Sequence, residues 1–387
     1  MVESYLTLSA GSIVIIILDI FKAYPVSGFK KDVRLTEKEV AHLRAIEVRK
    51  PGDIHVVEVK KPELETDTDV LVKVQAVGIC GSDMHIYHGS NPFTVYPRII
   101  GHEVGGIVEE VGSGVHDLRP GDRVALEPIS SCGVCYACKK GRPNVCAKLE
   151  VFGVHRDGGM REWMVAPEAN WHKVKGDLPF EAAALVEPMT IGAQAAYRGN
   201  IEPEDTVFIM GAGPTGIACL IMAKQKGATV FISDLQANRL EYAKQVGADF
   251  TIHLPHEEPE AVLFEKTDGE LANVVIDAVG TNTTFAEAVR LASVAGTVVT
   301  LGFNETPSNI PSLLLTKKEL TVAGSRLQTN QFPDVIRQVN EQKVDPASII
   351  SHRFDFDEVK KAIELLEKEP ANVRKAVLIF DREDESK

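Results

Sequence analysis

A glycine-rich motif in the second half of the chain places the strongest constraint on the fold. The motif, GAGPTG at 211–216, follows a short apolar run, DTVFIM, and precedes a helix-like stretch, IACLIMAKQKG. A second apolar run, TVFISD, ends in Asp234. A GxGxxG pattern alone is a weak signal, but a strand before it, a helix after it and an acid ending the next strand complete the context of a dinucleotide-binding unit. The sequence therefore predicts a doubly wound parallel sheet, an α/β Rossmann domain, over residues 196–330, with ELTVAGSRLQTN (319–330) as its last strand.

The residues of this motif also predict which dinucleotide is bound. One glycine permits the tight turn, the second lets the pyrophosphate approach the backbone, and the third lets helix and strand pack closely, while the helix N-terminus faces the phosphates. A carboxylate at Asp234 would hydrogen-bond the adenosine ribose hydroxyls and repel the extra phosphate of NADP. We therefore predict NAD as the cofactor, bound by Asp234 and by the motif residues Gly211, Gly213, Pro214, Thr215 and Gly216.

The chain before this motif has a different pattern. Strand-like runs, AIEV, HVVEV and DVLVKVQAVGI, follow one another with turn residues between them. Because this beginning lacks helical periodicity, it favours an irregular β-barrel over a second doubly wound sheet.

Four of the six cysteines lie within one short segment, with the spacing Cys132-x2-Cys135-x2-Cys138-x7-Cys146. Four thiolates at this spacing can surround one tetrahedral zinc ion and fill every ligand position, which is the arrangement of a structural site. Four unrelated free thiols at such a spacing are improbable. Six cysteines in a chain of 387 residues do not form a disulfide scaffold, so we expect a reducing, cytoplasmic compartment.

A second group of metal-ligand residue types lies in the stretch GICGSDMHIYHGSNPFTVYPRIIGHE at 78–103. Cys80, His102 and a carboxylate are the ligand types that zinc accepts, and a catalytic zinc takes three of them and leaves one position open. Taken alone, Cys80 would be interpreted as a small buried apolar residue, and His102 as a core histidine whose nitrogens have hydrogen-bond partners. The four-cysteine segment and the dinucleotide motif that follow make the zinc interpretation the better one.

These segments resemble a known family. GICGSDMHIYHG, GHEVGGIVEEVGSGV and PGDRVALEP are similar to segments of the zinc-dependent medium-chain alcohol and polyol dehydrogenases, and the resemblance extends from about Leu43 to the C-terminus. NPFTVYPRIIGHE and SRLQTNQFPDVI resemble most the bacterial starvation-sensing-protein-type branch, which acts on L-gulonate or L-galactonate at carbon 5. The resemblance implies a GroES-like β-barrel catalytic domain, 43–195 and 331–387, around the Rossmann domain.

The resemblance also implies a mechanism and roles for single residues. It implies oxidation of a hydroxyl by hydride transfer to NAD, with zinc polarising the hydroxyl. Glu187 matches a carboxylate of the catalytic zinc site, and Glu103 is the direct ligand in some polyol dehydrogenases, so both carboxylates remain candidates. Ser82 and His85 match a proton relay, and Asp83 matches an acid that orients the ligand histidine. Other matched positions are Arg326, near substrate, Arg239, by the adenosine, and Val279, Gly302 and Phe303, beside the nicotinamide.

The bulk charge limits the possible partners. The net charge of −13 argues against nucleic acid or an anionic membrane as a partner. A small sugar acid or polyol is the expected substrate, and the family implies a homodimer or homotetramer. Three alternatives stay open: a sorbitol, xylitol or threonine dehydrogenase, a zinc-free nucleotide-binding reductase, and a regulatory protein that senses NAD.

The first 42 residues differ from the rest of the chain. The apolar run SIVIIILDIF is too short to span a bilayer, and the N-terminus lacks the basic residues of a secretory signal. Leu43 can be encoded by an alternative start codon, and Lys38-Glu39-Val40 can be encoded by a ribosome-binding sequence. We therefore expect residues 1–42 to be either a translated leader from a misassigned start or an extension that docks on a partner subunit.

Overall fold

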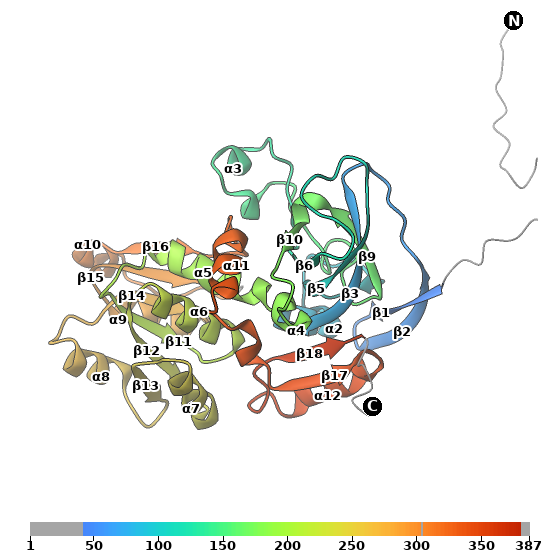
Figure 1. Ribbon diagram of the computed structural model, residues 1–387. Coiled ribbons are helices and arrows are strands. Elements are labelled where there is room, and N and C mark those ends of the chain that lie inside the picture. Colours follow the sequence, from blue (N-terminus) through green and yellow to red (C-terminus); the bar gives the residue numbers. More distant parts are fainter. Residues whose placement is uncertain (1–41, 303–304, 381–387) are drawn as a thin grey trace, which may run out of the picture. The chain divides into compact units, whose positions relative to one another are not determined.

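The computed structural model of the protein describes residues 42–302 and 305–380. Apart from His42, the predicted N-terminal extension lies outside this part of the chain, and so does Phe303. Figure 1 shows the arrangement of the helices and strands.

The first half forms antiparallel sheets, as its sequence pattern predicts. Strand β3 (Asp69–Ile79) pairs with β5 (Glu103–Val111), β9 (Trp163–Pro167) and β18 (Ala376–Ile379). Most β3 side chains on both faces are buried, which explains its near-continuous apolar sequence. The same sheet contains β6 (Arg123–Leu126), β10 (Trp171–Lys173) and β17 (His352–Asp355), in the order β10-β6-β5-β3-β18-β17. A smaller sheet has the order β2-β1-β4 and consists of β1 (His42–Lys50), β2 (Asp53–Lys60) and β4 (Arg98–Ile99).

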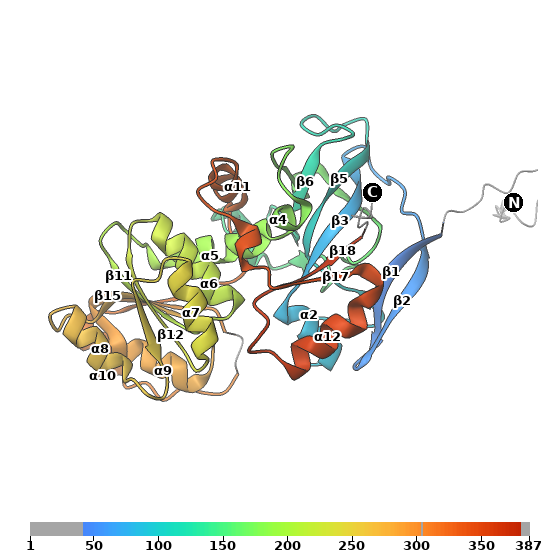
Figure 2. The same ribbon diagram turned by 60° about the horizontal axis from the view of Figure 1, so that its bottom comes forward.

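Short helices and one small ribbon connect these strands. Helix α2 (Gly81–His88) follows β3, and α12 (Val359–Lys368) lies beside it (Figure 2). The two helices are joined by His88, whose Nε2 is 2.8 Å from Glu367 Oε1. The remaining elements of this part are β7 (Ile129–Ser130), α3 (Tyr136–Lys139), β8 (Glu150–Val151) and α4 (Phe180–Ala184), with 3-10 turns at Pro143–Val145, Glu168–Asn170, Pro346–Ile349 and Phe356–Glu358.

The second half contains a six-stranded parallel sheet with the order β13-β12-β11-β14-β15-β16. This order, in which the chain first moves outward from β11 and then continues on its other side, confirms the predicted doubly wound sheet. The strands are β11 (Thr206–Met210), β12 (Thr229–Asp234), β13 (Phe250–His253), β14 (Ala272–Asp277), β15 (Ala292–Thr300) and β16 (Thr321–Gly324).

Helices cover both faces of this sheet because alternate strand residues point to opposite sides. Val207 and Ile209 share a core with helices α5 (Val186–Gly199), α6 (Pro214–Gln225), α7 (Ala237–Gln245) and α11 (Phe332–Asn340). Phe208 and Met210 share a separate core with α8 (Pro259–Lys266), α9 (Asn282–Leu291) and α10 (Ser312–Lys318). Strands β17 and β18 then rejoin the sheet of the first half. The predicted domain boundaries at 195 and 331 stay predictions.

One element is shorter than its sequence suggests. Residues 319–330 read as a single strand, but β16 ends at Gly324. Leu327 and Asn330 have positive φ angles, and Gln328 and Thr329 are buried with their side chains bonded to other parts of the chain. The segment therefore forms a polar loop held by tertiary contacts, which local sequence pattern does not reveal.

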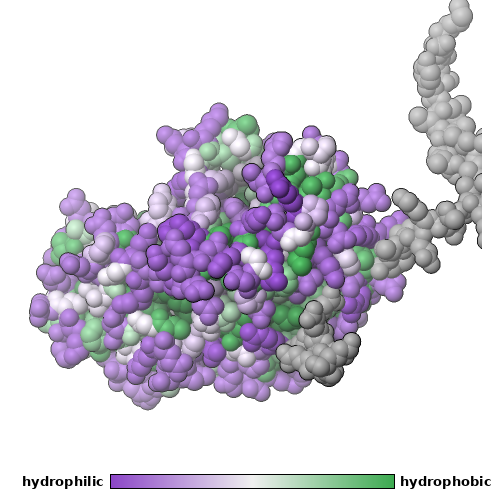
Figure 3. Space-filling view, viewed as in Figure 1, coloured by the Kyte–Doolittle hydropathy of each residue, from purple (hydrophilic) through white to green (hydrophobic). Residues whose placement is uncertain are grey.

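Among the described helices, none has the length and apolar character that a membrane span requires. On the face seen in Figure 3, hydrophobic residues form small groups scattered among hydrophilic ones.

Candidate active site

The pairing of two strands brings the first group of metal-ligand residues together. Cys80 follows β3 and caps helix α2, whereas His102 precedes β5 and Glu103 begins it. In the antiparallel register, Gly78 lies opposite Glu103, so the ends of the two strands meet. As a result, one ligand atom from each of Cys80, His102 and Glu103 lies within 4.8 Å of the others.

Buried contacts fix the orientation of this group. The Asp83 carboxylate is fully buried and accepts hydrogen bonds from the backbone N–H of Cys80 (2.9 Å) and of Gly101 (3.1 Å). Its Oδ1 lies 3.8 Å from His102 Nδ1, while Ser82 Oγ lies 3.4 Å from His102 Nε2. Burial raises the pKa of Asp83, and the charge of His102 opposes this shift. The carboxylate thus links the cysteine and histidine positions through one side chain.

The donor set fits a zinc ion. Within the described part of the chain, the carboxylate oxygen Glu103 Oε2 is buried and has no hydrogen-bond partner. Such orphaned polar atoms are costly unless a ligand or ion satisfies them. Although burial lowers the pKa of His102, the charges of Cys80, Asp83 and Glu187 raise it well above its usual value, so negative charge concentrates here. A cation with sulfur, nitrogen and oxygen ligands matches this arrangement.

The two candidate carboxylates differ in their surroundings. Glu103 Oε1 accepts a 2.6 Å hydrogen bond from Lys375 Nζ, and both side chains are almost fully buried. A Cβ added at Gly78 would lie 1.9 Å from Glu103 Oε2, so the glycine makes room for the carboxylate. Glu187, on α5, is buried as well, and burial raises its pKa to about 7, but it does not belong to the close group of three ligand atoms.

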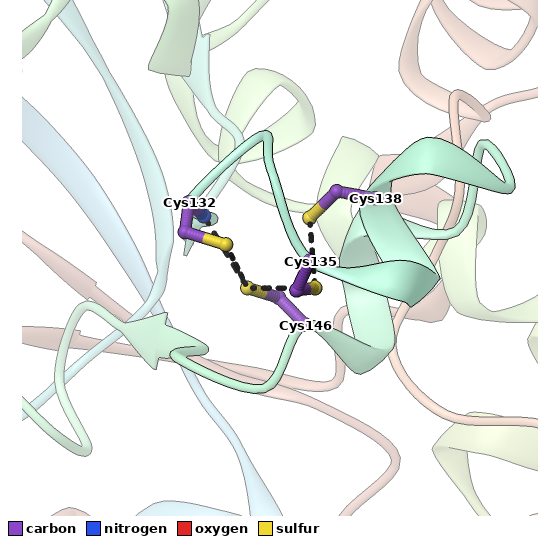
Figure 4. Close-up of side chains that lie close together, drawn as sticks. All are labelled: Cys132, Cys135, Cys138 and Cys146. Atoms are coloured by element: carbon purple, nitrogen blue, oxygen red, sulfur yellow. Dashed lines mark hydrogen bonds between the residues drawn. The ribbon is translucent and has the colours of Figure 1, made fainter.

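The four cysteines converge on one point from a loop around α3 (Figure 4). Neighbouring Sγ atoms are 3.5 Å apart for Cys135 and Cys138, 3.8 Å for Cys135 and Cys146, and 3.4 Å for Cys146 and Cys132. A tetrahedron with Zn–S bonds of about 2.3 Å has edges of about 3.8 Å. Backbone N–H groups, that of Ala147 foremost, lower the pKa of Cys135 to about 6, which favours a thiolate. Burial raises the pKa of Cys138 to about 11, so the convergence of the four sulfur atoms is what fits a structural zinc.

The dinucleotide motif borders a cavity of about 410 Å³. Asp234 lies at the end of β12, where Oδ2 accepts a hydrogen bond from the N–H of Ala212 and Oδ1 from that of Gln236, both 2.8 Å. Arg239 Nη1 lies 3.7 Å from Asp234. Gly211 and Val279 line the same cavity, whereas Gly302, after β15, packs against the backbone of Gly280, after β14. The expected adenosine-binding residues are therefore together.

Two predicted residues have other neighbours. His85 is exposed, and its Nδ1 lies 2.9 Å from Ser90 Oγ; the described residues show no hydrogen bond from it to Ser82. The Arg326 guanidinium lies 5.5 Å from the centroid of the Phe93 ring, which in turn stacks on His155. The proton relay thus stays a prediction, and Arg326 belongs to a cluster with Phe93 and His155.

Sequence reasoning missed Lys375 and His155. Lys375 begins an apolar run, KAVLIF, and a lone cation at the start of a buried strand is the signal that could have pointed to a buried ion pair. His155 lies in a segment without any metal-ligand spacing, so nothing local distinguishes it.

Comparison with known proteins agrees with this geometry. Two family models match the chain: the alcohol dehydrogenase GroES-like domain over residues 66–176 and the zinc-binding dehydrogenase over residues 214–341. The starvation-sensing protein RspB of Escherichia coli is 40% identical over 87% of this chain and 99% of its own length. The L-galactonate-5-dehydrogenase of the same species is 38% identical over 75% of this chain and 85% of that protein. A crystal structure of E. coli RspB complexed with NADH has a TM-score of 0.83 and 39% identity, covering 88% of this chain and 99% of that one.

These matches span the antiparallel sheets of the first half, the parallel sheet, the zinc-ligand stretch and the dinucleotide motif. They confirm the predicted GroES-like and Rossmann architecture, with zinc and a nicotinamide dinucleotide as cofactors. The chain therefore belongs to the zinc-type, NAD-dependent alcohol and polyol dehydrogenase family.

Proposed function

We propose that this enzyme oxidises a secondary hydroxyl of a sugar acid, as L-gulonate and L-galactonate 5-dehydrogenases do. The observation that carries the proposal is the cluster of Arg326, Phe93 and His155. A guanidinium can hydrogen-bond the hydroxyls of a polyol, but it suits a carboxylate better, because paired bonds to a charged acceptor are stronger. Burial lowers the pKa of His155, and the charge of Arg326 lowers it further, while the charge of Glu150 opposes this shift.

A short connection along the chain and one backbone hydrogen bond link this cluster with the proposed catalytic residues. Phe93 lies shortly after α2, the helix that Cys80 caps. The segment containing His155 runs along the backbone just before His102, where the N–H of Gly159 donates to the carbonyl of Gly101 over 2.8 Å. A substrate hydroxyl near His102 and a substrate carboxylate near Arg326 therefore suit one small molecule with both groups.

The remaining residues would perform the chemistry around the reacting carbon. When bound, zinc lowers the pKa of the substrate hydroxyl, and NAD accepts the hydride. We assign Cys80, His102 and Glu103 as the ligands, since their atoms form the close group, and Glu187 as the nearby second carboxylate. Asp83 orients His102, and Ser82 Oγ accepts the proton that leaves the hydroxyl and passes it outward, with His85 as its proposed exit.

We also propose a homodimer or homotetramer in which the cofactor sheet continues into a second copy. Strand β16 lies at the edge of that sheet, and its residues are mostly exposed, including Val322. An edge strand of this kind leaves backbone groups available for pairing. Light scattering on the purified protein measures the state, and a monomer would contradict the proposal.

The test of substrate class is NADH formation with L-gulonate, L-galactonate, D-sorbitol, xylitol and L-threonine, each with NAD and with NADP. We expect turnover of the sugar acids to exceed that of the polyols. We expect Arg326→Gln to raise KM for the acid by about tenfold or more, since hydrogen bonds to charged groups contribute about 1.5–3 kcal/mol, and to leave KM for polyols nearly unchanged.

Arg123→Gln is the matched control, because Arg123 also lies over an aromatic ring, Phe180, at 4.2 Å, but outside the cluster. Turnover of sorbitol, xylitol or threonine alone would replace the sugar acid as the substrate and keep the dehydrogenase chemistry.

A further inference from the structure

The loop that carries Arg326 is attached to the catalytic half by buried polar side chains. Gln328 Nε2 donates a short hydrogen bond to Glu127, whose other oxygen lies 2.6 Å from His172 Nε2. The N–H of Thr329 donates to Gln194 Oε1 over 3.0 Å. Because Gln194, Gln328 and Thr329 are all buried, water cannot easily replace these bonds.

One contact in this network comes from the cysteine loop itself. Asn144, two residues before Cys146, is 1% exposed. Its Nδ2 donates to the backbone carbonyl of Arg326 over 2.7 Å, and its Oδ1 accepts from Thr329 Oγ1 over 2.5 Å. Since the backbone carbonyl of Arg326 can only accept, the NH2 end of the Asn144 amide must face it, and the Thr329 hydroxyl then donates to the amide oxygen.

The backbone at Arg326 needs such a restraint. Strand β16 stops at Gly324, so Arg326 receives no support from strand pairing. Leu327 and Asn330 adopt the left-handed region, which residues other than glycine rarely occupy without tertiary contacts. The carbonyl held by Asn144 therefore fixes the position from which the Arg326 side chain reaches Phe93.

From these contacts we infer that Asn144 is a positioning residue for substrate recognition and that the four-cysteine loop, through it, sets where the Arg326 guanidinium lies. The inference rests on the proposed role of Arg326 as the residue that binds the substrate carboxylate. It assigns the cysteine loop a part in specificity in addition to its structural one.

The test compares Asn144→Leu, which has a similar volume and no donor, with Thr329→Val, which removes only the hydroxyl that bonds the amide oxygen. We expect both variants to raise KM for the sugar acid, by about tenfold for Asn144→Leu given the value of a buried hydrogen bond. The value of kcat, the KM for NAD and the KM for a neutral polyol should stay close to those of the unchanged enzyme. A purely structural role would lower stability without this selective change in KM.

Asn273→Leu is the matched control, because Asn273 Oδ1 also makes one 2.7 Å hydrogen bond to a backbone group, the N–H of Thr206, away from Arg326. It should lower stability similarly and leave KM for the sugar acid unchanged. Crystal structures of the Asn144→Leu and unchanged proteins provide a readout that does not need turnover, and we expect the Arg326 guanidinium to move away from Phe93.

The outcomes separate the two proposals. If Arg326→Gln leaves the preference for sugar acids intact, the carboxylate role of Arg326 is wrong. If Arg326→Gln removes the preference while Asn144→Leu changes neither KM nor the position of the guanidinium, the role of Asn144 is wrong and that of Arg326 stands.

Discussion

At the residue scale, a single buried ion pair holds the Glu103 carboxylate beside Cys80 and His102. Lys375 Nζ lies 2.6 Å from Glu103 Oε1, and the side chains are 3% and 1% exposed. Although burial lowers the pKa of Lys375, the charge of Glu103 raises it above its usual value, so the lysine stays protonated. Removing one partner of such a pair leaves the other charge buried without compensation, which costs about 3–5 kcal/mol.

We therefore expect Lys375→Met to lower the free energy of unfolding by about this amount, measured by chemical denaturation. The loss should be larger after zinc is removed than in the zinc-loaded protein, because a cation at Glu103 Oε2 would replace part of the missing charge. Lys368→Ala breaks the exposed pair with Glu364 and serves as the control, with a change within about 0.5 kcal/mol. An equal loss with and without zinc would argue against Glu103 as a ligand.

At the element scale, two positions of the dinucleotide motif require glycine for different physical reasons. A larger residue should therefore impair folding at one position and cofactor binding at the other. A Cβ at Gly216 would lie 1.8 Å from the carbonyl oxygen of Gly211, so helix α6 could not approach the end of β11. A Cβ at Gly213 would meet no protein atom within 4 Å, and its φ of −70° suits alanine. The space beside Gly213 is where the pyrophosphate of the dinucleotide is expected.

Gly216→Ala should therefore lower the melting temperature, by roughly 2–3 °C if the strain reaches about 2 kcal/mol. Gly213→Ala should melt like the unchanged protein but bind NADH at least about tenfold more weakly. Thermal unfolding and NADH fluorescence titration measure the two quantities. Normal NADH binding by Gly213→Ala would contradict the predicted position of the cofactor phosphates.

At the scale of the whole molecule, the sequence predicted those features that depend on local pattern or on fixed spacing. The strand, glycine motif and helix around Gly211 could be recognised because each signal lies within a few residues of the next. The four cysteines could be recognised by their spacing alone. The parallel sheet followed from the alternation of apolar runs and helices.

Contacts between distant segments could not be predicted in this way. Glu103 and Lys375 are 272 positions apart, and Arg326 meets Phe93 only because two loops fold against each other. The segment after Gly324 is predicted as a continuation of the strand, whereas it forms a loop in which Gln328 and Thr329 bond the distant residues Glu127 and Asn144. Such contacts depend on tertiary packing, which overrides local propensity.

The two zinc sites predict a graded response of the molecule to metal removal. One group offers one thiolate, one imidazole and one carboxylate, with an open position, whereas the other offers four thiolates and no open position. A closed site contributes its binding energy to folding, while an open site contributes to chemistry. We expect two zinc ions per chain, and a chelator should remove the one at the open site first, abolishing NADH formation while the circular dichroism spectrum is kept. Loss of the second ion should then lower the melting temperature.

Metal analysis of Cys80→Ser and Cys135→Ser distinguishes the sites, because each variant should keep one ion. Only Cys135→Ser should melt at a clearly lower temperature. A Cys80→Ser variant with both ions would refute the assignment of the open site, because no other group of three such residues lies within the described ranges.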